Sequence, residues 1–263
     1  MSYQSGTTIN GTVATATVSG SSIADLTTWD SRPDGTSDGE RGVASTGAIY
    51  RWHAASSLWV ANEAYEAGTL AHVATIDGDE NQAAIEALGY TVTKSGSGVI
   101  TNTTISGREY VTLDSDASNG DTCYLKVSTV SGYGRYYAGY VRVDATGTSS
   151  YAGGVIFFED GARKYYSSLV KDLNDVVWVS GTNTAGSFLD GGADVRTAAV
   201  WFEMLVSPGG GGYIRTGNSE NWHSCVGPTQ LSATSLIQDR IGDLSGSFSS
   251  EMHLAEFTTW AIS

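Results

Sequence analysis

Several kinds of residue are scarce in this sequence of 263 residues, and each shortage excludes a class of protein. Two cysteines are too few for a disulfide framework. The 14 lysines and arginines are scattered singly against 28 acidic residues, which gives a net charge of −14 at pH 7. Because nucleic acids are bound through clustered cations, this balance argues against nucleic acid as a partner.

Long apolar stretches are also missing. No run of 18 or more apolar residues occurs, so we expect no membrane insertion. The first residues, MSYQSGTTIN, carry neither a basic stretch nor an apolar one, so we expect no signal peptide of the usual kind.

The composition that remains is typical of β structure. Thirty-three glycines and many serines and threonines accompany only three prolines, which suits tight turns between short strands. No long helical period is visible. We therefore predict an all-β protein, in which a small N-terminal β-module with one short helix precedes a two-layer antiparallel β-sandwich.

The N-terminal part of the chain is expected to be built from short elements. Residues 1–28 predict one weakly alternating strand that needs a partner in another subunit or a larger assembly. Turn formers are dense in residues 28–42. Two short aromatic strands follow, and we expect Tyr50, Trp52 and Trp59 to form the core of a small meander.

One short helix is predicted near residues 80–88. Asp79 is the expected N-cap, Gln82 occupies the third helical position, and Gly89 supplies the left-handed residue that ends the helix. A helix this short is marginal alone, so we expect it to pack against the rest of the protein or between subunits.

From residue 91 onward the alternation of apolar and polar residues predicts at least seven strands. The run VIFFEDGARKYY predicts a hairpin that turns at Asp160-Gly161. We therefore divide the chain into an N-terminal attachment and oligomerisation region, residues 1–90, and a β-sandwich, residues 91–263.

The aromatic meander carries one resemblance to a known family. An acidic-glycine turn is followed by Tyr50 and Trp52, with Trp59 on the next strand. In this arrangement residues 34–60 resemble a small β-module common in bacteriophage tail and fibre proteins.

The C-terminal part carries a second resemblance. Ile241-Gly242, Phe248 and the closing run Leu254-Ala255-Glu256-Phe257 follow one another at its end. Through these positions, and through the run VWFEMLVSPGGGGYIRTGN before them, residues 100–263 resemble concanavalin-like, laminin-G-type jelly-roll sandwiches with a lectin-like fold.

The resemblances imply a bacteriophage virion structural protein, either a tail fibre or a head fibre or capsid decoration protein, made in the host cytoplasm. They imply that the N-terminal region contacts other virion proteins and that the chain forms a homo-oligomer, with a trimer typical of such fibres. A tail location implies receptor binding to a host cell-surface glycan. The alternatives are a polysaccharide-degrading depolymerase and a bacterial surface adhesin or lectin.

The sequence offers little for catalysis. Retaining glycosidases on this fold carry E-x-D-x-(x)-E on one strand, and no such run is present. Glu251 and Glu256 are five residues apart, which predicts opposite faces of a strand. No metal-binding spacing connects the four histidines, His53, His72, His223 and His253. We therefore expect a non-enzymatic protein with no catalytic residue, no metal and no cofactor.

One loop has two interpretations. Asp114, Asp116 and Asp121 offer hard oxygen ligands for calcium in the run LDSDASNGDTC. Their spacing departs from a calcium-loop pattern, because Ser118 and Asn119 stand where an acidic residue and a glycine belong. An ordinary turn-rich loop is the favoured interpretation.

Strand alternation predicts buried roles for several other residues. Cys123 is interpreted as a small buried hydrophobe, with a bridge to Cys225 as the alternative. Trp178 and Trp201 alternate within strands and are interpreted as core residues.

The candidate glycan-binding residues lie in or beside expected loops. Aromatic faces stack on sugar rings, while amides and carboxylates bond to hydroxyl groups. On this basis the candidates are Tyr213, Asn221, Trp222 and His223. Core packing or a subunit contact is the favoured alternative for the same residues.

Overall fold

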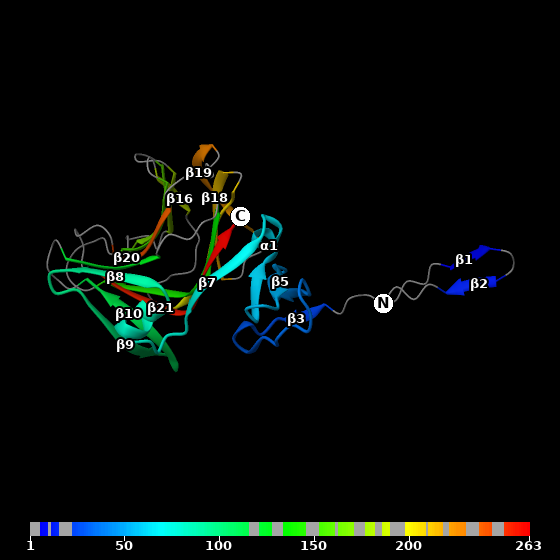
Figure 1. Ribbon diagram of the computed structural model, residues 1–263, viewed down its shortest axis with the longest axis horizontal. Coiled ribbons are helices and arrows are strands. Elements are labelled where there is room, and N and C mark those ends of the chain that lie inside the picture. Colours follow the sequence, from blue (N-terminus) through cyan, green and yellow to red (C-terminus); the bar gives the residue numbers. More distant parts are fainter. Residues whose placement is uncertain are drawn as a thin grey trace.

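The chain folds into two large β-sheets and two smaller ones, as shown in the computed structural model (Figure 1). The structure describes residues 6–9, 12–15, 23–115, 121–127, 134–145, 153–160, 163–170, 177–181, 186–189, 198–208, 210–217, 221–229, 237–243 and 250–263.

The two large sheets are antiparallel throughout and form the predicted sandwich. In spatial order the eight-stranded sheet contains β19 (His223–Thr229), β18 (Gly210–Thr216), β17 (Val200–Val206), β12 (Gly134–Ala145), β21 (Ser250–Ile262), β10 (Arg108–Asp114) and β9 (Val99–Ile105), with β7 (Leu70–Ile76) beside the last part of β21. The seven-stranded sheet contains β16 (Gly186–Leu189), β15 (Val177–Gly181), β14 (Arg163–Val170), β13 (Gly153–Asp160), β20 (Ile237–Asp243), β11 (Thr122–Val127) and β8 (Tyr90–Ser95). The prediction of an all-β sandwich is confirmed.

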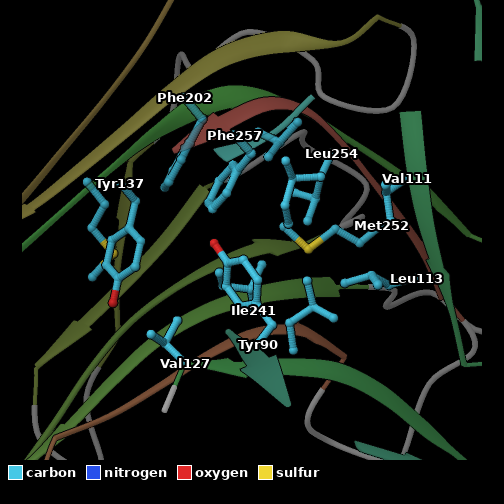
Figure 2. Close-up of a cluster of buried hydrophobic side chains, with 14 of the residues drawn as sticks. Tyr90, Val111, Leu113, Val127, Tyr137, Phe202, Ile241, Met252, Leu254 and Phe257 are labelled. Carbon is cyan, nitrogen blue, oxygen red and sulfur yellow. The ribbon is translucent and has the colours of Figure 1, made fainter. Parts of the chain in front are cut away.

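Strand alternation explains the core between these two sheets. Along β11, Cys123, Leu125 and Val127 are buried while the residues between them are partly exposed. From the other sheet, apolar side chains such as Phe202 and Leu254 meet them (Figure 2). The predicted hairpin is also present, since β13 and β14 pair in register as far as Asp160 opposite Arg163.

A small four-stranded sheet builds the N-terminal module, which we define as residues 23–67. It contains β3 (Ala24–Leu26), β4 (Arg41–Ala44), β5 (Ile49–His53) and β6 (Leu58–Ala61), with a 3-10 helix η1 (Trp29–Ser31) and a helix α1 (Asn62–Glu66). Tyr50, Trp52 and Trp59 are at most 6% exposed, as predicted for the core of the meander. The sequence analysis did not predict α1.

The module packs on the outer face of the eight-stranded sheet, opposite the sandwich core. A second buried cluster joins Leu26, Trp29 and Tyr50 of the module to Tyr136 and Trp201 of the sheet. Every residue of β17 is buried, because one face of this strand meets the sandwich core and the other meets the module. Its near-continuous apolar run has the same physical origin.

The predicted helix is present as α2 (Gln82–Ala87), but its N-cap is Asn81 rather than Asp79. The Asn81 side chain accepts a hydrogen bond from the Ala84 backbone amide at 3.0 Å, because Asn at this position reaches the third helical amide. The helix connects β7 of one large sheet to β8 of the other, and Ile85 reaches the sandwich core. A short helix is thereby stabilised by packing, as expected.

The first strands differ from the prediction. Instead of one strand with an external partner, β1 (Gly6–Ile9) and β2 (Thr12–Thr15) pair with each other as an antiparallel hairpin. The division of the chain at residue 90 stays a prediction; β7 lies before that boundary and pairs with β21 beyond it. Among the described residues, neither helix has the length and apolar character needed to cross a membrane.

Candidate functional site

A buried hydrogen-bonded network fixes the module against the sheet. The Glu203 carboxylate on β17 accepts hydrogen bonds from Tyr50 of the module at 2.9 Å and from Tyr136 of β12. Arg215 donates to both oxygens of the same carboxylate, at 2.5 and 3.0 Å. Tyr136 Oη also accepts a hydrogen bond from the backbone amide of Ala61, a residue of the module, at 3.3 Å. The module therefore sits in one defined position, because each polar group meets a specific partner.

Burial and charge act together in this network. Glu203 and Arg215 are each at most 1% exposed. Burial and the adjacent Glu203 carboxylate raise the pKa of Tyr50 and Tyr136, so both hydroxyls keep the protons that they donate. Burial disfavours the charge of Arg215, but Glu203 outweighs this effect and the pKa of the guanidinium rises. A charged pair with satisfied hydrogen bonds results.

A β-bulge lies beside the module, at the point where β21 changes its neighbour from β10 to β7. Glu256 has a positive φ of 47° there, and the register with β12 shifts around Gly139. A side chain at Gly139 would place Cβ 2.5 Å from Phe257 Cα, so the close approach of the strands requires glycine.

The bulge overturns one expectation. Met252, Leu254 and Phe257 face the sandwich core, while Ala255 faces the module. Two consecutive residues, 255 and 256, thus occupy the outer side. Glu251 and Glu256 therefore share a face, contrary to the prediction from their spacing, because the extra residue reverses the alternation. Their partners remain separate, since Glu256 binds Arg32 and Glu251 lies beside His253.

A cleft of about 450 Å³ opens where the module meets the sheet. We call it the Asp30 cleft. Its lining residues are Asp30, Ile105, Ser106, Gly107, Arg108, Tyr110, Tyr140, Ala198 and Ala199.

Three local structures position the polar side chains of the Asp30 cleft. Asp30 lies on η1, next to Trp29, whose ring packs 4.9 Å from that of Trp201. Arg108 follows the two-residue turn between β9 and β10, in which Ser106 and Gly107 both have positive φ, as tight hairpins require. Tyr140 directly follows the glycine of the bulge.

These side chains form one connected group. Asp30 Oδ1 accepts hydrogen bonds from Tyr140 and from Arg108, the latter at 2.9 Å. The Arg108 guanidinium lies 3.6 Å above the Tyr140 ring. The hydrogen bond from Tyr140 and the charge of Arg108 lower the pKa of Asp30, while burial raises the pKa of Tyr140. The carboxylate is thus ionised and the phenol protonated at neutral pH.

A second hollow of about 200 Å³ adjoins the first and shares Asp30 with it. On its floor Arg32 donates to Glu256 at 2.9 Å, and Arg108 lies 3.6 Å from the other oxygen of the same carboxylate. Charged side chains of alternating sign therefore connect the two hollows, in the order Asp30, Arg108, Glu256 and Arg32. Trp52 and Trp59 contribute an aromatic wall.

This arrangement suits a polar, uncharged ligand with several hydroxyl groups. Asp30 is 66% exposed and accepts hydrogen bonds, while Arg108 is 26% exposed and donates them. Aromatic and aliphatic side chains form the remaining walls, which is the common mixture in sites for small ligands.

The predicted glycan-binding residues lie elsewhere. Tyr213 and Trp222 are partly buried and pack against the cluster beneath the module, and Trp222 lies 4.4 Å from the Arg215 guanidinium. Asn221 is exposed. His223 begins β19, and its side chain lies outside the described residues. Their role in glycan binding stays a prediction.

Sequence reasoning missed the Asp30 cleft. Asp30, Arg108 and Tyr140 are separated by 78 and 32 residues in the chain. The sheet brings Arg108 and Tyr140 together, and only the packing of the module adds Asp30. The Ser106-Gly107 turn is the single local signal that the sequence offered.

The proposed calcium loop is only partly described. Asp114 ends β10, and Asp121 accepts hydrogen bonds from the Ser97 amide and hydroxyl at 3.0 and 2.8 Å. Asp116 lies outside the described residues. The Asp121 carboxylate therefore stabilises the adjacent turn at residues 95–98. The interpretation as an ordinary loop, with calcium binding as the alternative, stays a prediction.

Two interpretations of buried residues are confirmed. Cys123 is fully buried, and its thiol donates to the Val99 carbonyl at 3.3 Å. Trp201 is 6% exposed. The side chains of Cys225 and Trp178 lie outside the described residues.

Comparisons with known proteins find similarity of structure alone. No protein-family model matches the sequence, and no curated protein matches it. A protein of unknown function from Shewanella oneidensis MR-1 superposes with a TM-score of 0.51 at 8% identity, over 73% of this chain and 86% of that one.

Two further structures superpose more loosely. The exoplasmic/lumenal domain of VIP36, bound to calcium and Man3GlcNAc, gives a TM-score of 0.48 at 12% identity, over 74% of this chain and 90% of that one. A carbohydrate esterase of the Shiga toxin-encoding bacteriophage phi24B gives a TM-score of 0.48 at 11% sequence identity, over 74% of this chain and 100% of that one. At such identities the similarity concerns the fold, a β-sandwich.

Proposed function

We propose that this chain is a non-enzymatic bacteriophage virion protein that binds a surface glycan of the host in the Asp30 cleft. The observation that carries the proposal is the cleft itself, because its donor, acceptor and apolar walls match the groups that a sugar presents. Its volume of about 450 Å³ is that of a small-ligand site.

The shared construction of the cleft supports recognition rather than simple packing. Asp30 comes from the module, whereas Arg108 and Tyr140 come from the sandwich. The network around Glu203 holds these two parts together, so the polar groups are fixed before a ligand arrives. Preorganised groups lose little freedom on binding, and affinity rises accordingly.

The virion part of the proposal rests on the sequence. The meander with Tyr50, Trp52 and Trp59 resembles a module of phage tail and fibre proteins, and the N-terminal region is proposed to contact other virion proteins. The protein is proposed to be either a tail fibre or a head fibre or capsid decoration protein. Gold-labelled antibodies on purified virions would test this. Label on the tail or the capsid supports the proposal, and unlabelled particles contradict it.

Glycan binding is tested on an array of bacterial surface glycans with the full chain. Arg108→Gln removes the principal exposed donor of the Asp30 cleft, and we expect at least a tenfold loss of affinity for any glycan bound. Asn221→Ala serves as the matched control, because Asn221 is exposed and represents the site predicted from the sequence.

The outcomes distinguish binding in the Asp30 cleft from binding at the residues predicted from the sequence. Loss of binding in Arg108→Gln with normal binding in Asn221→Ala supports the Asp30 cleft. The reverse pattern places the glycan beside Trp222, and a chain that binds no glycan contradicts the proposal. Release of reducing sugar from host capsule would contradict its non-enzymatic part.

A further inference from the structure

A group of ionisable side chains, none of which lines the Asp30 cleft, lies on the outer face of the eight-stranded sheet. Asp144 on β12 stands directly opposite Glu251 on β21, and His253 lies two residues further along β21 on the same side. Their nearest ligand atoms are all within 4.8 Å of one another. Strand alternation places Glu251 and His253 on one face, and strand pairing adds Asp144.

Hydrogen bonds orient the His253 ring with Nε2 toward the two carboxylates. Thr112, which donates to Thr103 at 3.0 Å, bonds His253 Nδ1 at 2.9 Å. On the other side of the ring, Nε2 bonds Asp144 Oδ2 at 3.2 Å and lies 3.7 Å from Glu251 Oε2. A metal ion bound here takes the place of a proton between the ring and the carboxylates.

Three ligand atoms thus converge, and His253 is only 1% exposed. An imidazole nitrogen and two carboxylate oxygens are donor atoms that divalent transition-metal ions bind in proteins.

We propose that His253 Nε2, Asp144 Oδ2 and Glu251 Oε2 form a binding site for a divalent transition-metal ion such as Zn²⁺. One imidazole with two carboxylates is a zinc ligand set, whereas calcium prefers six to eight oxygens. With tetrahedral metal bonds of about 2.1 Å, two ligand atoms lie about 3.4 Å apart. The observed distances of 3.2 and 3.7 Å lie on either side of this value.

Outer contacts orient two of the three ligands. Thr112 fixes the orientation of the His253 ring, as partners of metal-bound histidines do. Arg142 binds Asp144 through Oδ1 at 3.0 Å, which leaves Oδ2 directed toward His253. Three protein ligands leave a fourth position for water or for an oxygen of another molecule. The site goes beyond the proposed glycan function and stands without it.

The test is a calorimetric titration of the full chain, stripped with a chelator, with Zn²⁺ at pH 7.5. We expect one ion per chain. Glu251→Gln and His253→Gln should each lower the affinity at least tenfold, and Thr112→Val about tenfold through loss of positioning. His72→Gln is the matched control, because this exposed histidine on β7 bonds Thr75 instead.

Circular dichroism monitors folding of the variants. Glu251 is 29% exposed, so Glu251→Gln is expected to fold even if His253→Gln does not. Co²⁺ gives a second measurement, since tetrahedral coordination produces strong visible absorption that Glu251→Gln should abolish. A wild-type chain that binds no Zn²⁺ overturns the proposal. So does equal affinity in wild type and Glu251→Gln, or an equal loss in His72→Gln.

Discussion

The two faces of the eight-stranded sheet are held to their neighbours in different ways. The inner face packs mainly apolar side chains against the second sheet, with one buried ion pair between Arg135 and Asp239 at 2.6 Å. The outer face packs aromatic residues against the module and places Glu203 at the centre of four hydrogen bonds.

The two faces therefore have different roles, one in forming the sandwich and the other in positioning the module. Apolar packing is tolerant, because many combinations of side chains of suitable volume fill a core. On the outer face, Tyr136 and Arg215 of the sheet hold the Glu203 carboxylate in place, and Tyr50 of the module must meet it there while Ala61 meets Tyr136. These directional bonds favour one placement of the module. The inner face therefore determines that a sandwich forms, while the outer face determines where Asp30 lies relative to Arg108 and Tyr140.

The largest effect is expected when the outer network loses its central charge. Glu203→Ala leaves the buried Arg215 guanidinium without its carboxylate, and we expect the free energy of unfolding to fall by about 4 kcal/mol. Urea denaturation measures the change. Glu109→Ala, at an exposed position on β10, is the control and should change stability by less than about 0.5 kcal/mol. Equal effects of both variants would contradict the importance of the network.

A cavity on the inner face should lower the free energy of unfolding somewhat less. Leu254→Ala removes a fully buried side chain from the sandwich core, and we expect a loss of about 3 kcal/mol. The glycan affinity of the surviving folded protein should stay unchanged, because the outer face is intact. Val99→Ala, at a position 41% exposed, provides the apolar control. A loss of glycan affinity in Leu254→Ala would show that the two faces are not separable.

Removing one hydroxyl from the outer network should have a smaller effect. Tyr50→Phe deletes the hydrogen bond to Glu203 but keeps the ring, and we expect a loss of about 1–2 kcal/mol. Tyr65→Phe, whose partly exposed hydroxyl bonds Asp38 at 3.0 Å, should lose less. Thermal denaturation compares the two variants, and the opposite order would contradict the argument from burial.

The smallest effect concerns acid pH. The pKa of Asp30 is lower in the folded chain than in the unfolded chain, chiefly because Tyr140 bonds the carboxylate. Its contribution to stability is therefore present above the unfolded pKa of about 3.9 and disappears as the pH falls through the folded value. Asp30→Asn should show a slightly weaker loss of stability than wild type below about pH 4. If the stability of wild type and of Asp30→Asn depended on pH in the same way, the connection between the pKa of Asp30 and stability would be contradicted.

The elements that sequence analysis predicted well are those governed by local pattern. Alternation located β11 and the hairpin of β13 and β14, and the aromatic meander gave Tyr50, Trp52 and Trp59 as core residues. Each of these expectations depends on neighbours within a few residues, where periodicity and turn chemistry decide the conformation.

The features that were missed depend on distant segments. The bulge at Glu256 reversed the alternation along β21, and the sequence gives no sign of it except Gly139 on another strand. Asn81 rather than Asp79 caps α2, because the helix begins at Gln82 and the Asn81 side chain reaches the Ala84 amide. The Asp30 cleft exists only after the module has packed, so no spacing in the sequence predicts it.

The most direct test of the account is a double-mutant cycle between the module and the sheet, using Tyr50→Phe, Glu203→Ala and the double variant. If the network joins the two parts, the hydroxyl contributes only while the carboxylate is present. We therefore predict a coupling free energy of about 1–2 kcal/mol from urea denaturation. Additive effects, with a coupling below about 0.3 kcal/mol, would contradict the claim that Glu203 fixes the module on the outer face.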